Sequence, residues 1–358
     1  MTPTALGLPT IRKAGSRDPA AVPADMPVTG PLVDTFGRIA TDLRVSLTDR
    51  CNLRCTYCMP AEGLNWLPGQ DLLSFEELTR LLTLAVTRLG ITNIRFTGGE
   101  PLLYRDLERV IAAVTALSPR PEVALTTNGI GLDRRAAGLA AAGLDRVNVS
   151  LDTVDREHFA AITRRDRLDD VLAGLAGAAA AGLGPVKVNA VLDPVTGPDD
   201  AAELLRFCLQ HGYQLRIIEQ MPLDGGHQWS RESTVPAQAI LAALQREFDL
   251  QADPAPRGSA PARLWLVDGG PATVGIIASV SEAFCSACDR TRLTADGQVR
   301  NCLFATEESD LRGLLRAGAD DAALESAWRV AMWRKAAGHG INDPGFVQPD
   351  RPMSAIGG

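Results

Sequence analysis

The sequence predicts an α/β protein: a partial (βα)6 barrel of the TIM type, followed by a smaller C-terminal α+β domain. Between about residues 42 and 220, short apolar runs alternate with amphipathic helical stretches, which is typical of right-handed βαβ units around a parallel sheet. Six such strands fit either a doubly wound sheet or a partial barrel. The barrel is favoured because polar, glycine-containing or cysteine-bearing segments follow the carboxyl end of one strand after another, where barrel sites are built.

The barrel strands are expected at Asp42–Leu47, Thr92–Thr97, Glu122–Thr127, Arg146–Leu151, Val186–Leu192 and Gln214–Gln220. A capping box at Ser74–Glu77 predicts the start of the first helix, and Gly90 predicts its end. Further helices are expected at Arg105–Leu117, Arg134–Ala142, Leu168–Ala181 and Asp199–His211. Several of them are followed by glycine, which commonly ends a helix.

Composition divides the chain into four segments. Residues 1–33, rich in Pro, Ala and Gly, are expected to form a mobile leader without a role in the chemistry. The barrel is expected at residues 34–220, the C-terminal domain at 221–340 and a tail at 341–358. The elements expected in the C-terminal domain are a helix at Pro236–Phe248, strands at Leu264–Val267 and Thr273–Ile277, a hairpin turning at Asp296–Gly297, and a helical stretch at Ser309–Lys335.

Charge and cysteine usage narrow the class of protein. The net charge of −7 does not favour nucleic acid or an anionic membrane as a partner, so an anionic ligand needs a local group of cations. The sequence contains no run of about eighteen apolar residues, so we expect no membrane span. Six of the seven cysteines lie in two tight groups, which indicates metal binding in a reducing compartment rather than disulfides. We therefore expect a cytoplasmic protein, either a monomer or a homodimer.

The first cysteine group is Cys51, Cys55 and Cys58, in the pattern C-x3-C-x2-C. Three thiolates this close suit an iron–sulfur cluster. A zinc site normally takes four protein ligands, and no fourth Cys or His follows here. A [4Fe–4S] cluster held by three thiolates leaves one iron open to a further ligand.

The second group is Cys285, Cys288 and Cys302, spaced C-x2-C-x13-C. A structural zinc knuckle is the competing interpretation, and His339 lies far downstream for a fourth ligand. Two incomplete cysteine triads in one chain favour two clusters, each with an open iron.

A turn at Gly98–Pro101 follows the second strand. Two glycines let the backbone approach a ligand closely, and Glu100 offers an acceptor for an ammonium group. Alone, this sequence would fit an ordinary strand-to-helix turn.

Together, Cys51–Cys58 and Gly98–Pro101 resemble the radical S-adenosylmethionine superfamily. With the second cysteine group, Asp289–Thr294 and the terminal Gly357–Gly358, the chain closely resembles the GTP 3′,8-cyclase (MoaA) family of molybdenum cofactor biosynthesis from about Asp42 onward. The resemblance implies two [4Fe–4S] clusters, each held by three cysteines. The first would bind S-adenosylmethionine and the second the guanine of GTP. A 5′-deoxyadenosyl radical would take the 3′ hydrogen of GTP, and the ribose radical would close onto C8.

The resemblance also implies residue roles. The contacts to S-adenosylmethionine would be Tyr57, Gly99, Ser150 and Met221, and those to GTP would be Arg44, Arg95, Thr126, Lys187, Arg290, Thr291 and Arg292. Strand alternation supports the roles of Arg44, Arg95 and Lys187. It places all three cations on the inner face of the barrel, where they need an anion. Thr127 competes with Thr126 for its role. Gly357 and Gly358 would reach into the cavity, where side chains do not fit.

The same resemblance implies a one-electron reductant and transfer of the product to cyclic pyranopterin monophosphate synthase. One alternative is a radical S-adenosylmethionine maturase that modifies peptides, although these tend to carry more C-terminal cysteines. The other is a non-enzymatic electron carrier or zinc-stabilised binding protein, which would normally complete each ligand set with a fourth residue.

Overall fold

The computed structural model describes residues 22–357 of the 358-residue chain. Residues 1–21 of the expected leader, and Gly358, lie outside the described residues. The end of the expected leader is anchored: β1 (Leu32–Val33) pairs with β2 (Ile39–Ala40), and the Arg329 guanidinium donates to the Gly30 carbonyl at 2.6 Å. No helix in the described part is long and apolar enough to cross a membrane.

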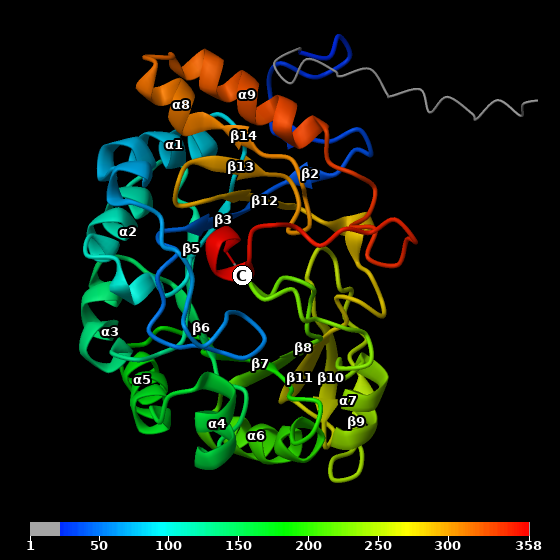
Figure 1. Ribbon diagram of the computed structural model, residues 1–358. Helices are drawn as coiled ribbons and strands as arrows, with labels where there is room; N and C mark the ends of the chain where they lie inside the picture. Colours follow the sequence, from blue (N-terminus) through cyan, green and yellow to red (C-terminus); the bar gives the residue numbers. More distant parts are fainter. Residues whose placement is uncertain (1–21, 358) are drawn as a thin grey trace, which may run out of the picture.

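The predicted barrel is confirmed. Neighbouring parallel strands form a curved sheet around a central space, in the order β3 (Asp42–Ser46), β4 (Asn93–Thr97), β5 (Glu122–Thr127), β6 (Arg146–Ser150), β7 (Lys187–Val191) and β8 (Gln214–Ile218) (Figure 1). The covering helices include α1 (Phe75–Thr87), α2 (Leu107–Thr115), α3 (Leu132–Ala141), α5 (Leu168–Ala180) and α6 (Gly197–His211). Helix α4 (Arg156–Thr163) was not expected. The capping box of Ser74 and Glu77 is present at the start of α1.

Strands from the C-terminal part extend the barrel sheet at both edges. On one side β12 (Arg290–Leu293) pairs in parallel with β3, followed by β13 (Gln298–Arg300) and β14 (Ser309–Asp310). On the other side β11 (Thr273–Ile277) pairs in parallel with β8, followed by β10 (Arg263–Val267) and β9 (Leu250–Ala252). The described residues thus form one 12-stranded sheet that crosses the expected boundary between residues 220 and 221. The domain division stays a prediction.

The C-terminal helices differ in detail from expectation. Helix α7 spans Ala237–Leu244, within the expected range. The helical stretch expected after residue 309 is divided into α8 (Leu311–Arg316) and α9 (Asp321–Trp333). The division occurs because Gly318 takes a left-handed conformation (φ 83°) and the Asp320 side chain caps α9 by accepting from the Ala323 N–H.

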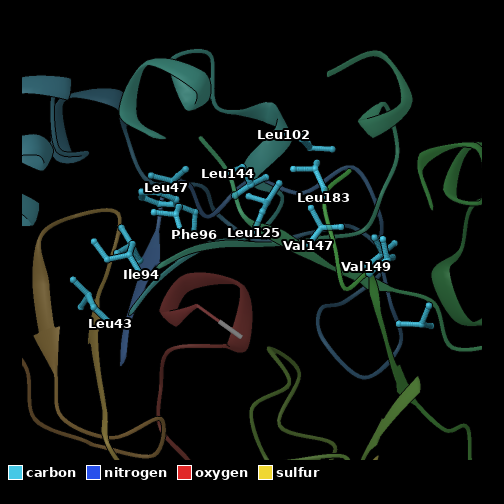
Figure 2. Close-up of a cluster of buried hydrophobic side chains, with 14 of the residues drawn as sticks. Leu43, Leu47, Ile94, Phe96, Leu102, Leu125, Leu144, Val147, Val149 and Leu183 are labelled. Atoms are coloured by element: carbon cyan, nitrogen blue, oxygen red, sulfur yellow. The ribbon is translucent and has the colours of Figure 1, made fainter. Parts of the chain in front are cut away.

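Strand alternation places apolar side chains between the sheet and the helices. Figure 2 shows this layer along neighbouring strands, including Leu43, Ile94, Phe96, Leu125 and Val147, all of which are buried. Burial of each such side chain stabilises the fold by about 1.5–3 kcal/mol. The alternate residues of the same strands therefore face the barrel interior, and apart from Ala124 those of β3 to β6 are polar or charged.

Candidate functional site

A row of cations crosses the inner face of the barrel. Arg292 of β12 lies in register with Arg44 of β3, and Arg44 with Arg95 of β4. Ala124 of β5 separates Arg95 from Arg146 of β6 in the same register. Side chains in register on neighbouring strands project from the same face, so these guanidinium groups line one surface.

Burial and mutual repulsion leave this row poised for an anion. Burial, reinforced by Arg44, lowers the pKa of Arg95 well below its usual value, and its Nε has no hydrogen-bond partner in the described structure. Burial and then Arg44 lower the pKa of Arg292 to about 9. Burial and then Arg146 lower the pKa of Lys187, on β7, to about 8. A bound anion would relieve the repulsion among these groups.

Carboxylates lie nearer the amino ends of the same strands. The Asp42 carboxylate accepts from Arg44 Nε at 2.8 Å, and Glu122 pairs with Arg146. Burial alone would raise the pKa of Asp42, but Arg44 and Arg95 hold it well below the usual range. Asp42 and Glu122 therefore offset part of the positive charge of the row.

The first cysteine loop follows β3. Its sulfur atoms receive hydrogen bonds: the Leu53 N–H lies 3.5 Å and Asn128 Nδ2 3.8 Å from Cys51 Sγ, and the Ser354 N–H donates to Cys58. Burial raises the pKa of all three thiols of the group. N–H donors directed at sulfur are typical of sites in which a metal cluster keeps the cysteines as thiolates.

Gly98 and Gly99 pack against the backbone that enters this loop. A Cβ on Gly98 would lie 2.4 Å from the Thr48 carbonyl oxygen, and one on Gly99 would lie 2.3 Å from that of Arg50. The Gly99 N–H donates to the Thr48 carbonyl at 2.7 Å. Because neither glycine carries a Cβ, the turn packs directly against the backbone that leads into the cysteine loop.

The expectation that Glu100 offers an acceptor to an ammonium ligand is corrected by its contacts. Its side chain is buried and accepts hydrogen bonds from the Thr127 hydroxyl (2.7 Å) and the N–H groups of Asn128 (2.7 Å) and Leu102 (2.9 Å). Burial raises its pKa to about 7. Glu100 thus joins the turn to the end of β5.

The same contacts decide between the two threonines. The Thr127 hydroxyl faces outward to Glu100. Thr126 lies in register with Asn148, and its hydroxyl accepts from Asn148 Nδ2 at 3.4 Å on the inner face. Thr126 thus faces the barrel interior, and its contact with a ligand stays a prediction.

Tyr57 borders a cavity of about 180 Å³ beside the first cysteine loop, together with Gln220 and Trp229. The Tyr57 hydroxyl donates to Asp152 Oδ2 at 2.8 Å, and Asp152 Oδ1 accepts from the Val191 N–H. Ser150, at the carboxyl end of β6, is half-buried. Met221 packs against a small apolar cluster that includes Ile356 of the tail.

The second cysteine group lies beside β12. Lys335, whose side chain is buried, places Nζ 3.3 Å from Cys288 Sγ and 2.7 Å from the Arg290 carbonyl oxygen. Arg290 NH1 lies 3.6 Å from the same sulfur. Burial would raise the pKa of Cys288, but Lys335 and Arg290 lower it. The backbone N–H of His339 donates to Cys285.

Thr291 does not share the surface of its neighbours. Arg290 and Arg292 face inward, whereas Thr291 is fully buried on the opposite side of β12 and accepts from Trp328 Nε1 at 3.3 Å. Because successive residues of a strand point to opposite faces, only the backbone of Thr291 is directed toward the surface of its neighbours, and its contact with the substrate stays a prediction.

The tail lies inside the barrel. Helix α10 (Met353–Ile356), red in Figure 1, occupies the central space. Arg292 donates to the Gly357 carbonyl, and a Cβ on Gly357 would lie 2.8 Å from Thr97 Cγ2 and 2.9 Å from Ser46 Oγ. Gly357 also has φ 77°, which favours glycine. The described part of the tail therefore lies in the barrel interior, and the role of the two glycines beside the substrate stays a prediction.

Several site residues were missed by sequence reasoning. Arg146 and Arg216 alternate on their strands as Arg44 and Arg95 do, so the same argument could have found them. Asn128 follows the carboxyl end of β5, the position where polar residues form barrel sites. Lys335 had no local signal, because its partner Cys288 lies 47 residues earlier.

Comparisons with known proteins agree with this geometry. The Radical SAM superfamily matches residues 45–208, and Molybdenum Cofactor Synthesis C matches residues 213–341. The chain is 76% identical to the GTP 3′,8-cyclase of Mycobacterium sp. (strain KMS) and 73% identical to that of Mycobacterium marinum, with 100% of each chain covered. The chain belongs to the GTP 3′,8-cyclase family. Its place in this family agrees with the predicted role in molybdenum cofactor biosynthesis.

Among solved structures, the chain resembles Streptococcus suis SuiB bound to the precursor peptide SuiA. The TM-score is 0.56 at 14% identity, covering 86% of this chain and 67% of SuiB. At this identity the likeness concerns the fold alone, and it agrees with a partial barrel.

The donor sets fit the cofactors of the cyclase family. The radical S-adenosylmethionine match supports a [4Fe–4S] cluster and S-adenosylmethionine in the barrel part. Each cysteine group supplies three soft thiol ligands with N–H or ammonium donors directed at sulfur, a set that suits iron–sulfur clusters. Residues 22–357 contain no group of three or more His, Cys, Asp or Glu side chains arranged to hold a single metal ion, whereas the thiolates of a [4Fe–4S] cluster bind different irons and lie further apart.

Proposed function

We propose that this chain converts GTP to (8S)-3′,8-cyclo-7,8-dihydroguanosine 5′-triphosphate as a radical S-adenosylmethionine enzyme. The observation that carries the proposal is the buried cation row inside the barrel, bordered by two groups of three cysteines. In a chain of net charge −7, buried cations at this density require an anionic ligand, and a triphosphate has the necessary charge.

The first cysteine group would hold the cluster that binds S-adenosylmethionine. Around it, Tyr57 is fixed by its hydrogen bond to Asp152 and would contact the adenine. Ser150 and Met221 would complete the contacts. Gly99 would serve the methionine end, and its packing against the Arg50 backbone keeps that end of the site close to the cysteines.

The triphosphate would lie along the cation row. Arg44, Arg95, Arg290 and Arg292 would offer forked donors, and Lys187 a compact charge, with Thr126 as a hydroxyl donor. Arg95 Nε, which has no hydrogen-bond partner in the described structure, is a donor ready for this role. Asp42 orients Arg44 by accepting from its Nε at 2.8 Å and, more weakly, from its NH2 at 3.4 Å.

The second cysteine group would hold a second [4Fe–4S] cluster, whose open iron would anchor the guanine. Lys335 and Arg290 support this assignment because they place positive charge beside Cys288. When bound, the first cluster and S-adenosylmethionine would supply, with one electron from the reductant, the 5′-deoxyadenosyl radical that removes the ribose 3′ hydrogen. The ribose radical would close onto C8, and a further electron and a proton would give the dihydro product. The residues of the chain bind, orient and exclude water around the reacting groups.

The terminal glycines would line the reaction space without side chains. Gly357 already contacts Ser46 and Thr97 on the inner wall, and Gly358 lies outside the described residues. Their small size would let the tail cover the substrate closely and shield radical species from water.

The reaction also needs a one-electron reductant, and the product would pass to cyclic pyranopterin monophosphate synthase. The six clustered thiols suit the reducing cytoplasm. The chain would work as a monomer or homodimer.

Anaerobic reconstitution tests the proposal. Iron and sulfide are loaded, dithionite and S-adenosylmethionine are added, and 5′-deoxyadenosine and guanine nucleotides are measured with and without GTP. We expect about eight irons per chain and GTP-dependent formation of both products. About four irons, or cleavage that does not depend on GTP, would count against it. GTP-independent cleavage would favour the alternative of a peptide-modifying maturase.

A further inference from the structure

The tail needs an anchor of its own. Helix α10 has only four residues, and a single helical turn is not stable in isolation. Ordering such a segment costs conformational entropy for each residue fixed. Specific contacts must therefore hold Met353–Gly357 inside the barrel.

Arg351 supplies a fork of contacts immediately before α10. Its NH1 and NH2 donate to Asp296 Oδ1 (3.0 Å) and Oδ2 (2.8 Å), and NH2 lies 2.9 Å from Glu308 Oε2. The Asp296 side chain is 8% exposed and that of Arg351 is 26% exposed. A bidentate arginine–carboxylate pair at this burial fixes direction as well as distance.

The contacts of Arg351 continue into the second cysteine site. Glu308 pairs with Arg300, whose side chain is buried. Arg300 in turn donates to the carbonyl groups of Leu303 and Ala305, which follow Cys302. Arg351 thus ties the tail to the loop that carries the third cysteine of the second group.

The far end of the tail meets the first cysteine site and the cation row. The Met353 N–H donates to the Leu223 carbonyl at 2.9 Å, and the Ser354 N–H donates to the Cys58 sulfur. The Gly357 carbonyl accepts from Arg292. Seven residues, 351–357, therefore connect both cysteine groups with the ligand space.

We infer that Arg351 is a positioning residue whose clasp on Asp296 and Glu308 seats the C-terminal tail in the barrel. This inference rests on the proposed function for its catalytic consequence, but the seating itself does not. Loss of the clasp frees the start of α10, so Gly357 spends less time against Ser46 and Arg292. Seating depends on a fork geometry that lysine reproduces only in part.

Release of the tail to carboxypeptidase Y measures the seating directly. Reconstituted wild type, Arg351→Gln, Arg351→Lys and the control Arg206→Gln are digested anaerobically, and released residues are followed by mass spectrometry. Arg206 forms an exposed ion pair with Glu247 on the outside of the barrel, so its variant controls for the loss of an arginine charge away from the tail. We expect release about tenfold faster in Arg351→Gln, smaller acceleration in Arg351→Lys, and the wild-type rate in the control.

A kinetic measurement on the same preparations adds the catalytic consequence. In Arg351→Gln we expect a lower kcat for the cyclised nucleotide with unchanged iron content and unchanged affinity for S-adenosylmethionine. Equal release from Arg351→Gln and wild type would overturn the inference. Loss of half the iron in Arg351→Lys would also overturn it, because Arg351 would then serve the second cysteine site instead of the tail. If wild type forms no cyclised nucleotide, the proposed function fails, while the release rates still decide the role of Arg351.

Discussion

Lys335 Nζ lies 3.3 Å from Cys288 Sγ, and the same ammonium donates to the Arg290 carbonyl at 2.7 Å. A buried lysine therefore joins a cysteine of the second group to β12, the strand that carries Arg290 and Arg292. Its position immediately after α9 means that the packing of this helix on the sheet fixes the ammonium beside the sulfur.

Replacement of Lys335 tests the second cysteine site. Lys335→Met removes the charge and donor at Cys288, and changes to outer contacts of this kind typically weaken metal binding about 10–100-fold. We expect iron per chain to fall from about eight toward about four while the first cluster stays. Lys335→Arg, which keeps the charge, is the control. Full iron content in Lys335→Met, measured by iron analysis and electron paramagnetic resonance, would contradict the role.

Substitution of Gly99 tests the support of the first cysteine loop. A Cβ on Gly99 would lie 2.3 Å from the Arg50 carbonyl and 2.4 Å from that of Asp49, so Gly99→Ala must displace the loop. We expect loss of the first cluster and a stability loss of about 1–3 kcal/mol in chemical denaturation. Gly69→Ala is a matched control, because no described atom lies within 4 Å of the added Cβ. An intact first cluster in Gly99→Ala would show that the close packing is not required.

Gly357→Ala tests the fit of the tail. The added Cβ would lie 2.8 Å from Thr97 Cγ2 and 2.9 Å from Ser46 Oγ, at a positive φ that alanine disfavours. We expect a fall in kcat for the cyclised nucleotide of about tenfold or more, with iron content and affinity for S-adenosylmethionine unchanged. The control Gly345→Ala adds a Cβ with no described atom within 4 Å. Equal kcat values for the two variants would contradict the prediction that Gly357 must lack a side chain.

The pKa of Lys187 predicts a pH dependence of GTP binding. Burial, Arg146, Arg216 and Arg95 lower this pKa from 10.5 to about 8, against the opposing effect of Glu122. The ammonium is charged below about pH 8 and loses its proton above it, so GTP affinity should fall as pH rises through this value. In Lys187→Met we expect about tenfold weaker GTP binding and a flatter pH profile between pH 7 and 9. Calorimetric titration across this range checks both. An unchanged profile in the variant would assign the pH dependence to another group.

The pH dependence of folding stability that comes from Lys187 has the opposite sign to that of GTP affinity. Between pH 8 and 10.5 the unfolded chain keeps the Lys187 proton that the folded, ligand-free chain has lost. The contribution of Lys187 to the free energy of unfolding therefore rises with pH in this window. Comparison of wild type with Lys187→Met in denaturant at pH 7.5 and pH 9.5 measures that contribution.

Sequence periodicity predicted the barrel because each strand buries one face completely. Phe96 and Leu43 are fully buried on the outer face, and the alternate residues Arg95 and Arg44 face inward, so a period of two was legible in the chain. The same alternation predicts that the Thr291 side chain points outward, because it stands between two inward arginines. Helix α4 is short and amphipathic only in part, and it was missed.

What the sequence could not show depends on contacts between distant residues. The pairing of β12 with β3 and of β11 with β8 extends the barrel sheet at both edges, and no local pattern specifies either partner. Glu100 was expected to meet a ligand, but its partners Thr127 and Asn128 lie 27 and 28 residues later. The Glu100 carboxylate is buried because the turn packs against the end of β5, a contact between distant residues that no local sequence pattern specifies.

Transfer of hydrogen from the substrate tests the central claim most directly. The reconstituted enzyme is given GTP carrying deuterium at the ribose 3′ carbon, and 5′-deoxyadenosine and the guanine nucleotide are examined by mass spectrometry. We expect one deuterium in 5′-deoxyadenosine and its loss from the cyclised nucleotide, in equal amounts. Formation of 5′-deoxyadenosine without deuterium, at the same rate whether or not GTP is present, would contradict the assignment of GTP as the substrate held by the cation row.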